Sequence, residues 1–408
     1  MARPGGTSYW TEVVDTSPQR GPPGERPPRI FTGTVTPPYQ LITTSAALAR
    51  LMGEVRTEPI LALDTEASSF HRYKERICLI QLSTRTKTWL IDPITIDDMR
   101  PLGAALADPA IEWVIHDADY DLRMLKKMYG FRAANVFDTM VSVELLNEPE
   151  LGLAANLKKH FGVELNKKFQ KADWSKRPLS NDMLAYAAMD TRHLIALRDI
   201  LKAELEAKGR MSWAKEEFEA LVDIPFAPVE EELGFLRIKG AKALKPRQLA
   251  VLRELHAWRE HLAEKLDRAP FMVLGNDVMI EASKEPPEDL QAFAARKGVG
   301  ESLIARNGAA IMKAIATGLD LPKEQWPRIP KPKRYDRDDD YEERLKRLKQ
   351  KRDQIATARD LRQGIVCPNH VLSEIARTLP GDAQALAGIP GLSKWQVREF
   401  GEELLRAL

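Results

Sequence analysis

Two carboxylates close a stretch with the texture of a buried strand, "PILALDTE", which ends at Glu66. Successive side chains on a strand alternate between faces, so Asp64 and Glu66, two residues apart, lie on one face. Such a pair can hold a cation or take part in acid–base chemistry. A solvated strand end explains a lone pair of this kind equally simply, so the choice depends on the other acidic residues.

Two further acidic residues complete a candidate cluster. Asp121 opens the helical stretch after "WVIHDADYD", and Asp190 ends "YAAMD". In an α/β sheet, strand ends and the helix starts that follow them can meet at one edge. Four carboxylates brought together would repel one another and raise some of their pKa values. Magnesium or manganese removes that repulsion, and two such ions about 3.5–4 Å apart are an established solution for phosphodiester cleavage.

The elements that must position these acids alternate between strand and helix from about Leu41. Strand patterns occur in "PILALDTE", "RICLIQLST", "KTWLIDPI", "EWVIHDA" and "NVFDTM", and the first three suggest an antiparallel meander. A helical stretch follows from Ser180, a possible N-cap, to about Lys208. Tyr186 and Asp190 are four residues apart on one face of it. The pattern predicts an α/β domain, a mixed sheet flanked by helices.

The chain beyond Pro225 is helical and internally repeated. Val278 and Gly308 have counterparts in Val371 and Gly401, at a constant offset (371 − 278 = 93 and 401 − 308 = 93). A fixed offset indicates two copies of one small helical unit. The segment between them is rich in proline and mixed charge, which is typical of a linker that leads into a helix.

Composition excludes several classes of protein. Of the 408 residues, 44% are hydrophobic and 29% charged, with a net charge of only +2, so a nucleic-acid partner must be argued from local sites. Cys78 and Cys367 fall in different predicted domains, which argues against a disulfide framework and fits a reducing cytoplasm. Apolar runs are too short for a membrane span, and the start lacks the apolar core of a signal peptide. A membrane partner is not expected.

These motifs, in this order, resemble ribonuclease D, a member of the DEDD superfamily of 3′-to-5′ exonucleases. The matching segments are "LALDTEASSF", "VIHDADYDLRML" and "LAYAAMDTRHL", with "FDTMVSVELL" and "FQKADWSKRPLS" between the last two. The resemblance implies a ribonuclease H-like exonuclease domain followed by two small all-α HRDC-like domains. It covers nearly the whole chain apart from the N-terminal arm.

Carried over position by position, the resemblance assigns the catalytic residues. Asp64, Glu66, Asp121 and Asp190 match the four acids that bind two divalent ions, Mg²⁺ or Mn²⁺. Tyr186 matches the tyrosine of the DEDDy branch and would orient the attacking water. Its pKa near 10 as a free phenol makes it a poor base.

Weaker expectations concern contacts to the substrate. After the first motif, Phe70, His71 and Arg72 are expected to touch the terminal nucleotide by stacking or through phosphate. His116, just before the second motif, is a further substrate-binding candidate, although a hydrogen-bonded histidine at a strand end is the competing interpretation. Gln81 is expected to face either the site or solvent. Trp174, Arg177 and Pro178 are expected either to shape the substrate channel or to pack a loop.

The expected domains are an arm (1–40), an exonuclease domain (41–225), a linker (226–240), a first HRDC-like domain (241–320), a linker (321–340) and a second HRDC-like domain (341–408). The expected protein is a monomeric cytoplasmic exoribonuclease that trims the 3′ ends of tRNA precursors or other structured RNA and releases nucleoside 5′-monophosphates. No nucleotide cofactor is expected, because the phosphate-loop pattern G-x-x-x-x-G-K-[ST] is absent from the sequence. A 3′-to-5′ DNA exonuclease and a non-catalytic RNA-binding adaptor remain as alternatives.

Overall fold

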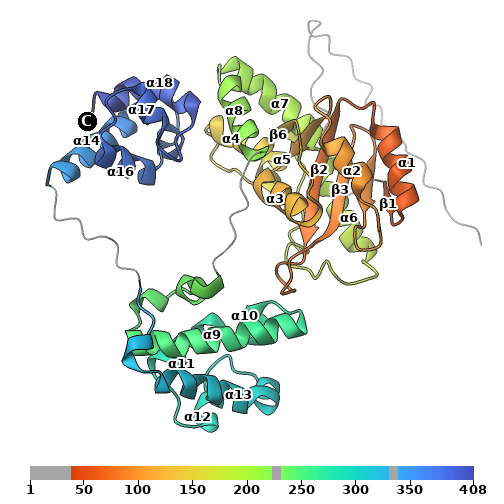
Figure 1. The fold of residues 1–408 in the computed structure, drawn as a ribbon. Helices are drawn as coiled ribbons and strands as arrows, with labels where there is room; N and C mark the ends of the chain where they lie inside the picture. The colour runs from red at the N-terminus through yellow and green to blue at the C-terminus, as the bar shows by residue number, and fades with distance from the viewer. Residues whose placement is uncertain (1–37, 223–230, 330–338) are drawn as a thin grey trace, which may run out of the picture.

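The computed structural model describes residues 38–222, 231–329 and 339–408. An N-terminal α/β domain is followed by two helical units, and Figure 1 shows the three parts in different colours along the chain. The first helical unit comprises the described residues 231–329, and the second comprises 339–408. This architecture confirms the predicted fold class.

One mixed sheet forms the centre of the α/β domain. Its strands are β1 (Tyr39–Ile42), β2 (Ile60–Ala67), β3 (Ile77–Ser83), β4 (Thr88–Ile91), β5 (Glu112–Ile115) and β6 (Val136–Asp138). The spatial order is β1-β4-β3-β2-β5-β6. The pairs β2/β3 and β3/β4 are antiparallel, and the other pairs are parallel. The predicted meander is therefore confirmed.

The sheet has one strand more than the sequence suggested. β1 includes Tyr39 and Gln40, which fall within the expected arm; the arm's residues 1–37 lie outside the described chain. This strand pairs in parallel with β4 at the sheet edge and exposes its middle residues. A four-residue edge strand carries too few alternating apolar positions to be recognised by its pattern.

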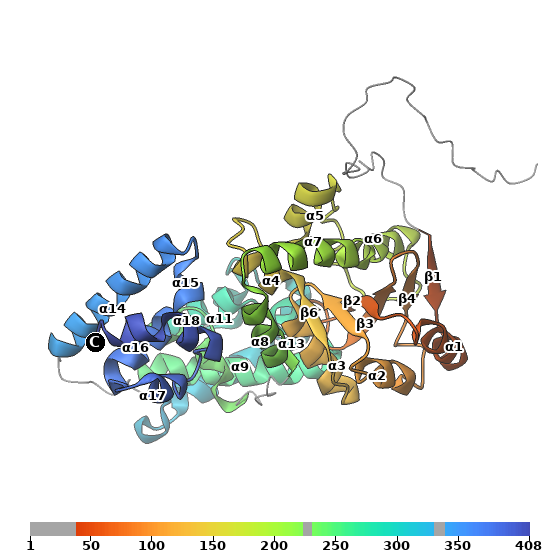
Figure 2. The same ribbon diagram turned by 90° about the horizontal axis from the view of Figure 1, so that it is seen from above.

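Helices cover both faces of this sheet (Figure 2). They are α1 (Ser45–Val55), α2 (Arg100–Leu106), α3 (Ala118–Tyr129), α4 (Thr139–Leu145), α5 (Leu153–Phe161), α6 (Asn181–Arg192), α7 (Leu194–Ala207) and α8 (Met211–Val222). Leu61, Leu63 and Leu82 point to the face packed against α1, α2 and α3. Asp64 follows Leu63 on β2 and therefore points to the opposite face, where α6 lies across β2, β3 and β4.

The helical stretch predicted from Ser180 to Lys208 is two helices. Ser180 caps α6 as expected, its hydroxyl accepting from the Met183 N–H at 3.3 Å. The helix ends at Arg192, and α7 begins after His193, whose ring stacks on Phe161. α6 contacts β2, β3 and β4, whereas α7 contacts β2 and β5. The two helices together therefore cross the sheet from β4 to β5.

The first helical unit contains η1 (Glu231–Arg237), η2 (Ala241–Ala243), α9 (Pro246–Leu266), α10 (Pro270–Val273), α11 (Asn276–Lys284), α12 (Leu290–Ala294), α13 (Glu301–Asp320) and η3 (Lys323–Gln325). The second contains α14 (Asp339–Ala358), α15 (Gln363–Val366), α16 (Asn369–Thr378), α17 (Ala383–Ala387) and α18 (Lys394–Leu405). α9 pairs with α13 in the first unit, as α14 packs on α16 and α18 in the second.

A buried arginine shows that the two units are copies of one fold. Arg259 Nη1 donates to Asn276 Oδ1 at 2.6 Å, and Arg352 Nη1 donates to Asn369 Oδ1 at 2.6 Å. Each arginine also reaches the backbone carbonyl two residues before its asparagine. Both residues of the pair keep the offset (352 − 259 = 93 and 369 − 276 = 93), so the repeat is present in the contacts as well as in the sequence.

The segments expected as linkers contribute to packing at their described ends. Phe235 and Ile238, within the expected linker 226–240, are buried in the core of the first unit. Ile329, within the expected linker 321–340, packs against the same core. The intervening residues 223–230 and 330–338 lie outside the described chain. Short apolar anchors among charged residues carry little periodic signal, which explains why composition alone marked these segments as linkers.

The second unit is docked on α8. The rings of Trp213 in α8 and Trp395 in α18 stack with centroids 4.5 Å apart and an interplanar angle of 14°. The Trp395 Nε1–H and the Ser393 hydroxyl both donate to Glu217 Oε1 at 2.6 Å. A buried aromatic stack of this kind carries stabilisation beyond its apolar area. The contacts fix the second unit to the α/β domain.

Two smaller expectations concern cysteine and membranes. Cys78 and Cys367 are both buried free thiols, as expected for cysteines in separate domains. None of the helices in the described ranges has the length and apolar character that a membrane crossing requires.

Candidate active site

The four candidate acids come from three elements, β2, α3 and α6, that meet near the end of β2. Asp64 and Glu66 lie near the end of β2, Asp121 in the first turn of α3, and Asp190 near the end of α6. Figure 1 shows α3 and α6 beside the sheet that contains β2. The side chains are buried or partly buried, so the charges are shielded from solvent.

Electrostatic coupling shows that these carboxyls are neighbours. Burial raises the pKa of Asp64 to about 7, although the backbone N–H of Thr65 lowers it. Burial and then the charge of Asp64 raise the pKa of Asp121 and of Asp190. The pKa of Glu66 is raised by burial and by all three aspartates. Asp64 contributes to every one of these shifts and therefore lies at the centre of the cluster.

The carboxyl groups are neighbours, but their oxygens do not converge on one point as metal ligands would. Within the described ranges, no group of three or more His, Cys, Asp or Glu side chains is placed to hold one metal ion. The donor set itself fits a hard cation, because it offers only carboxylate oxygens whose mutual repulsion a divalent charge would relieve.

Thr65 links two of the acids from the other face of β2. Its hydroxyl donates to Asp121 Oδ1, and this bond lowers the pKa of the Asp121 carboxyl against the stronger effect of burial. The residue lies between Asp64 and Glu66, so its side chain points toward α3. Thr65 was not among the residues predicted from the sequence. Its position between the two acids was the only available signal.

Tyr186 lies beside the acids on α6, one turn before Asp190. Burial, followed by the charges of Asp190, Glu66 and Asp64, raises the pKa of Tyr186 above its usual value. The hydroxyl is therefore protonated at neutral pH and can donate a hydrogen bond. Its ring is held by Trp174, with centroids 6.1 Å apart. This environment favours an orienting role over that of a base.

Gln81 points to the same face as Asp64. The two residues are direct partners across the antiparallel pair β2/β3, which places their side chains side by side. Gln81 is fully buried, and both its amide oxygen and its amide nitrogen lack a hydrogen-bond partner within the described chain. An unpartnered buried amide is costly and suits a group that is completed by a ligand. Of the two orientations considered from the sequence, the one toward the site is observed.

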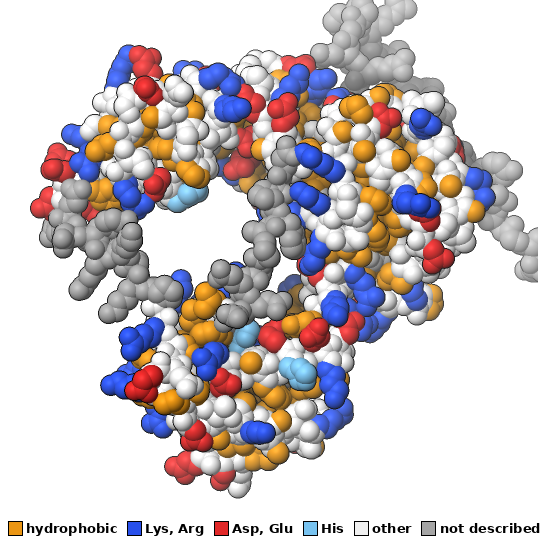
Figure 3. Space-filling view, viewed as in Figure 1, with side chains coloured by type: hydrophobic (Ala, Val, Ile, Leu, Met, Phe, Trp, Pro, Cys, Tyr) orange, Lys and Arg blue, Asp and Glu red, His pale blue; other side chains and the backbone are white. Residues whose placement is uncertain are grey.

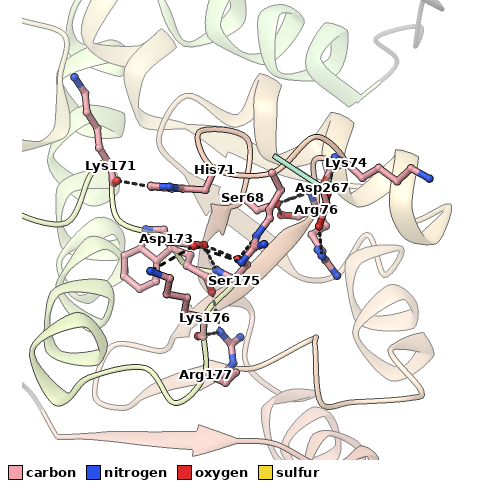
Figure 4. A network of polar contacts seen from close by, with 12 residues as sticks. Ser68, His71, Lys74, Arg76, Lys171, Asp173, Ser175, Lys176, Arg177 and Asp267 are labelled. Atoms are coloured by element: carbon pink, nitrogen blue, oxygen red, sulfur yellow. Dashed lines mark hydrogen bonds and ion pairs between the residues drawn. The ribbon is translucent and has the colours of Figure 1, made fainter. Parts of the chain in front are cut away.

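Three of the four expected substrate residues lie on the loop 68–76, which is anchored to the loop before α6 (Figure 4). His71 Nε2 lies 2.8 Å from the Lys171 carbonyl oxygen, and Arg72 Nε donates to Ser175 Oγ at 2.7 Å. Arg72 also pairs with Asp173. Phe70 remains exposed. These bonds give His71 and Arg72 a role in loop anchoring, and their contact with a nucleotide stays a prediction.

His116 lies at the end of β5 and is largely buried. Its Nδ1 lies 2.9 Å from Thr139 Oγ1, and burial lowers its pKa to about 4. The ring is therefore neutral at pH 7 and offers no positive charge to a phosphate. The hydrogen bond supports the alternative interpretation as a strand-end histidine, and substrate contact by His116 stays a prediction.

Trp174 and Arg177 pack the loop before α6. The Trp174 side chain is fully buried. Arg177 donates to both carboxylate oxygens of Asp92, at 2.6 and 2.7 Å, and to the Cys78 carbonyl oxygen at 2.7 Å. A bidentate arginine of this kind fixes geometry. The packed-loop interpretation is therefore supported, with Trp174 acting on the site through Tyr186.

Asp138 holds the turn that presents Asp121. Its carboxylate accepts from the backbone N–H of Ala118 at 2.7 Å and of Asp117 at 3.3 Å, at the start of α3. It also caps α4 by accepting from Met140 and Val141. The sequence carries a signal for the second role only, an aspartate directly before a helix.

We expect Asp138→Ala to lower the free energy of unfolding by about 2–4 kcal/mol, because it leaves several buried N–H groups unpaired. Urea denaturation of the full chain measures this loss. Asp138→Asn keeps one acceptor oxygen and should lose less. A change below about 0.5 kcal/mol for the alanine variant would show that the turn is held by other contacts.

Comparisons with known proteins agree with this geometry. A family described as 3′-5′ exonuclease matches residues 39–206, and the HRDC domain matches residues 248–315 and 342–408. The fold and the matched domains thus define a 3′-5′ exonuclease followed by two HRDC domains.

Individual similar proteins identify the family more narrowly. Ribonuclease D of Gluconacetobacter diazotrophicus is 31% identical over 297 residues, which cover 72% of this chain and 75% of that protein. The crystal structure of Escherichia coli RNase D matches with a TM-score of 0.68 and 26% identity, covering 91% of this chain and 98% of that one. A protein from Bifidobacterium adolescentis matches with a TM-score of 0.77 and 28% identity, covering 90% and 96%. The chain belongs to the ribonuclease D family and is a 3′-5′ exoribonuclease.

Proposed function

We propose that this exoribonuclease depends on two divalent metal ions, Mg²⁺ or Mn²⁺, and trims RNA precursors such as tRNA, releasing nucleoside 5′-monophosphates. The observation that carries the proposal is the coupling of Asp64 to the three other carboxyls. Such a buried cluster is unfavourable without a compensating positive charge. A pair of bound ions would supply that charge at the scissile phosphate and an activated water.

The residues of this chain have distinct roles in the proposal. Asp64, Glu66, Asp121 and Asp190 hold the ions. Tyr186, whose pKa is raised by burial and by the neighbouring carboxylates, donates its hydroxyl proton in a hydrogen bond that orients the attacking water. The buried Gln81 amide, beside Asp64 in the sheet, hydrogen-bonds a group that enters the site.

The remaining assignments concern the path of the RNA. The 3′ end would reach the acids past Phe70, His71 and Arg72 on the loop 68–76, and His116 would make a further contact. The exonuclease domain (41–225) would cleave and the HRDC domains (241–320 and 341–408) would hold the strand. The two buried free thiols are compatible with a reducing cytoplasm, and we propose a monomer acting there.

Product analysis tests this proposal. A single-stranded RNA and its DNA counterpart with the same sequence are incubated with the full chain and Mg²⁺ or Mn²⁺, and the products are separated by chromatography. We expect nucleoside 5′-monophosphates, formed faster from RNA. Faster digestion of DNA would favour the DNA exonuclease. Tight RNA binding without product would leave the non-catalytic adaptor.

Metal binding should also be visible in stability. Because the pKa of Asp64 is raised from 3.8 to about 7 on folding, the folded protein holds one more proton than the unfolded chain between these values, and metal-free stability falls as pH rises from about 4 to about 7. Saturating Mg²⁺ should reverse this fall, by about 2.7 kcal/mol at a hundredfold excess over Kd. Thermal unfolding between about pH 5 and 8, with Mg²⁺ or chelator, measures both effects. An identical Tm in both buffers would argue against a cation site.

A further inference from the structure

Three Phe or Tyr side chains are exposed in the described chain, and all three lie on or beside the loop 68–76. Phe70 is 41% exposed, Tyr120 is 40% exposed and Phe271 is 46% exposed. The rings of Phe70 and Phe271 lie 5.1 Å apart between centroids, and the Tyr120 hydroxyl donates to Glu75 Oε1 of the same loop. Single exposed apolar residues scattered over a surface are normal and need no explanation. Exposed rings gathered at one place, in contrast, indicate a binding surface.

Phe271 belongs to the first HRDC domain, which is docked on this loop. The Ala269 N–H donates to the His71 carbonyl oxygen at 3.1 Å, and Arg76 Nη2 donates to Asp267 Oδ2 at 3.1 Å. The pair Phe70–Phe271 therefore spans two domains and begins four residues after Glu66 in the chain.

The second HRDC domain provides an internal comparison. Its Asp360 is equivalent to Asp267 (360 − 267 = 93); both have positive φ, and Asp360 likewise contacts the exonuclease domain, through Asn147. Gly364 occupies the position equivalent to Phe271 (364 − 271 = 93). The turn that contains Asp360 thus contacts the exonuclease domain, as the turn with Asp267 does, but without an aromatic ring at the equivalent position. Neither the helical fold nor the docking requires Phe271 to be aromatic.

One lysine lies over the pair, and two further cations at the domain border are held in ion pairs. Lys171 Nζ lies 5.7 Å from the centroid of the Phe70 ring. Lys74 pairs with Glu264 across the domain border, and Arg76 pairs with Asp267. In Figure 3, Lys and Arg side chains gather where the first HRDC domain meets the exonuclease domain. Aromatic rings among cationic side chains are the combination that binds single-stranded nucleic acid, because bases stack and phosphates pair with the cations.

We propose that Phe70 and Phe271 form one stacking platform, shared by the exonuclease domain and the first HRDC domain, for bases of single-stranded RNA upstream of the 3′-terminal nucleotide. The proposal rests on the proposed function and adds to it a residue outside the nuclease motifs. It gives the first HRDC domain a defined contact with the substrate, which the second, with Gly364, lacks.

Binding without hydrolysis tests the platform. The full chain, in chelator, is titrated with a single-stranded RNA of about 12 nucleotides that carries 2-aminopurine at successive positions from the 3′ end. Phe271→Leu keeps the apolar volume and removes the stacking face, so RNA affinity should fall by about fivefold or more. Quenching of 2-aminopurine should be lost at one upstream position. Phe271→Trp should restore both.

Matched controls separate the platform from the catalytic site. Ile94→Ala changes another exposed apolar residue, 40% exposed and outside this cluster, and should leave affinity unchanged. Hydrolysis of the p-nitrophenyl ester of a nucleoside 5′-monophosphate, which carries no base upstream of the terminal nucleotide, should stay within about twofold in Phe271→Leu. Wild-type affinity and quenching in this variant would overturn the proposal and assign the pair to domain packing. If the wild-type protein showed no metal-dependent hydrolysis, the proposed function would be contradicted. The RNA-binding measurements in chelator would still test the platform.

Discussion

Replacing Asp64 with Asn should reduce hydrolysis of a 3′-ended RNA by about 10³-fold or more, equivalent to roughly 4 kcal/mol of transition-state stabilisation. Asp64 is the carboxyl that couples to the three others, so its loss would weaken both proposed ions. Initial rates on a labelled RNA at saturating Mg²⁺ measure the effect. Asp119→Asn is a matched control, because Asp119 is an α3 acid that pairs with Arg123 on the helix surface.

The same substitution should leave the metal-free protein as stable as the wild type, or more stable, since it removes like-charge repulsion from a buried cluster. Thermal unfolding in chelator provides this comparison. A metal-free Asp64→Asn variant that unfolds at a much lower temperature would show that the carboxylate is structural. Retained activity would show that the acids do not act as proposed.

Tyr186→Phe should lower kcat by about 10- to 10³-fold while preserving the stabilisation by Mg²⁺. The phenylalanine ring keeps the packing against Phe169 and Trp174, so only the hydroxyl is lost. Because the pKa of Tyr186 is raised, wild-type activity should not decline through deprotonation of this residue up to about pH 9. Single-turnover rates across about pH 6–9 separate the chemical step from RNA binding.

Tyr129→Phe is the control for loss of a hydroxyl, since Tyr129 stacks on Phe131 at the far end of α3. An unchanged rate in Tyr186→Phe would assign the Tyr186 hydroxyl to packing. Equal losses in both variants would point to a general effect on stability.

Local pattern was sufficient to predict most of the fold. The spacing of Asp64 and Glu66 on a strand, and of Tyr186 and Asp190 on a helix, gave their faces before any contact was known. The constant offset of 93 gave the paired helical units, because both copies preserve the glycine and asparagine positions that shape them.

Contacts between distant segments could not be predicted in this way. The hydrogen bond from Thr65 to Asp121, and the bonds that Asp138 accepts from the Asp117 and Ala118 N–H groups, depend on elements that meet only in the folded chain. Predicting the orientation of Gln81 requires knowledge of the register of β2 against β3. Phe271 had no local signal at all, since its significance arises from the docking of the first HRDC domain beside Phe70.

The most direct test of the central claim is a time course on a 5′-labelled RNA with a free 3′ hydroxyl, with Mg²⁺, Mn²⁺ or chelator, beside the Asp190→Asn variant. The account predicts a ladder that shortens from the 3′ end only when a divalent ion is present and only with the wild-type chain. Shortening in chelator, or an Asp190→Asn variant that digests the RNA at the wild-type rate, would contradict it.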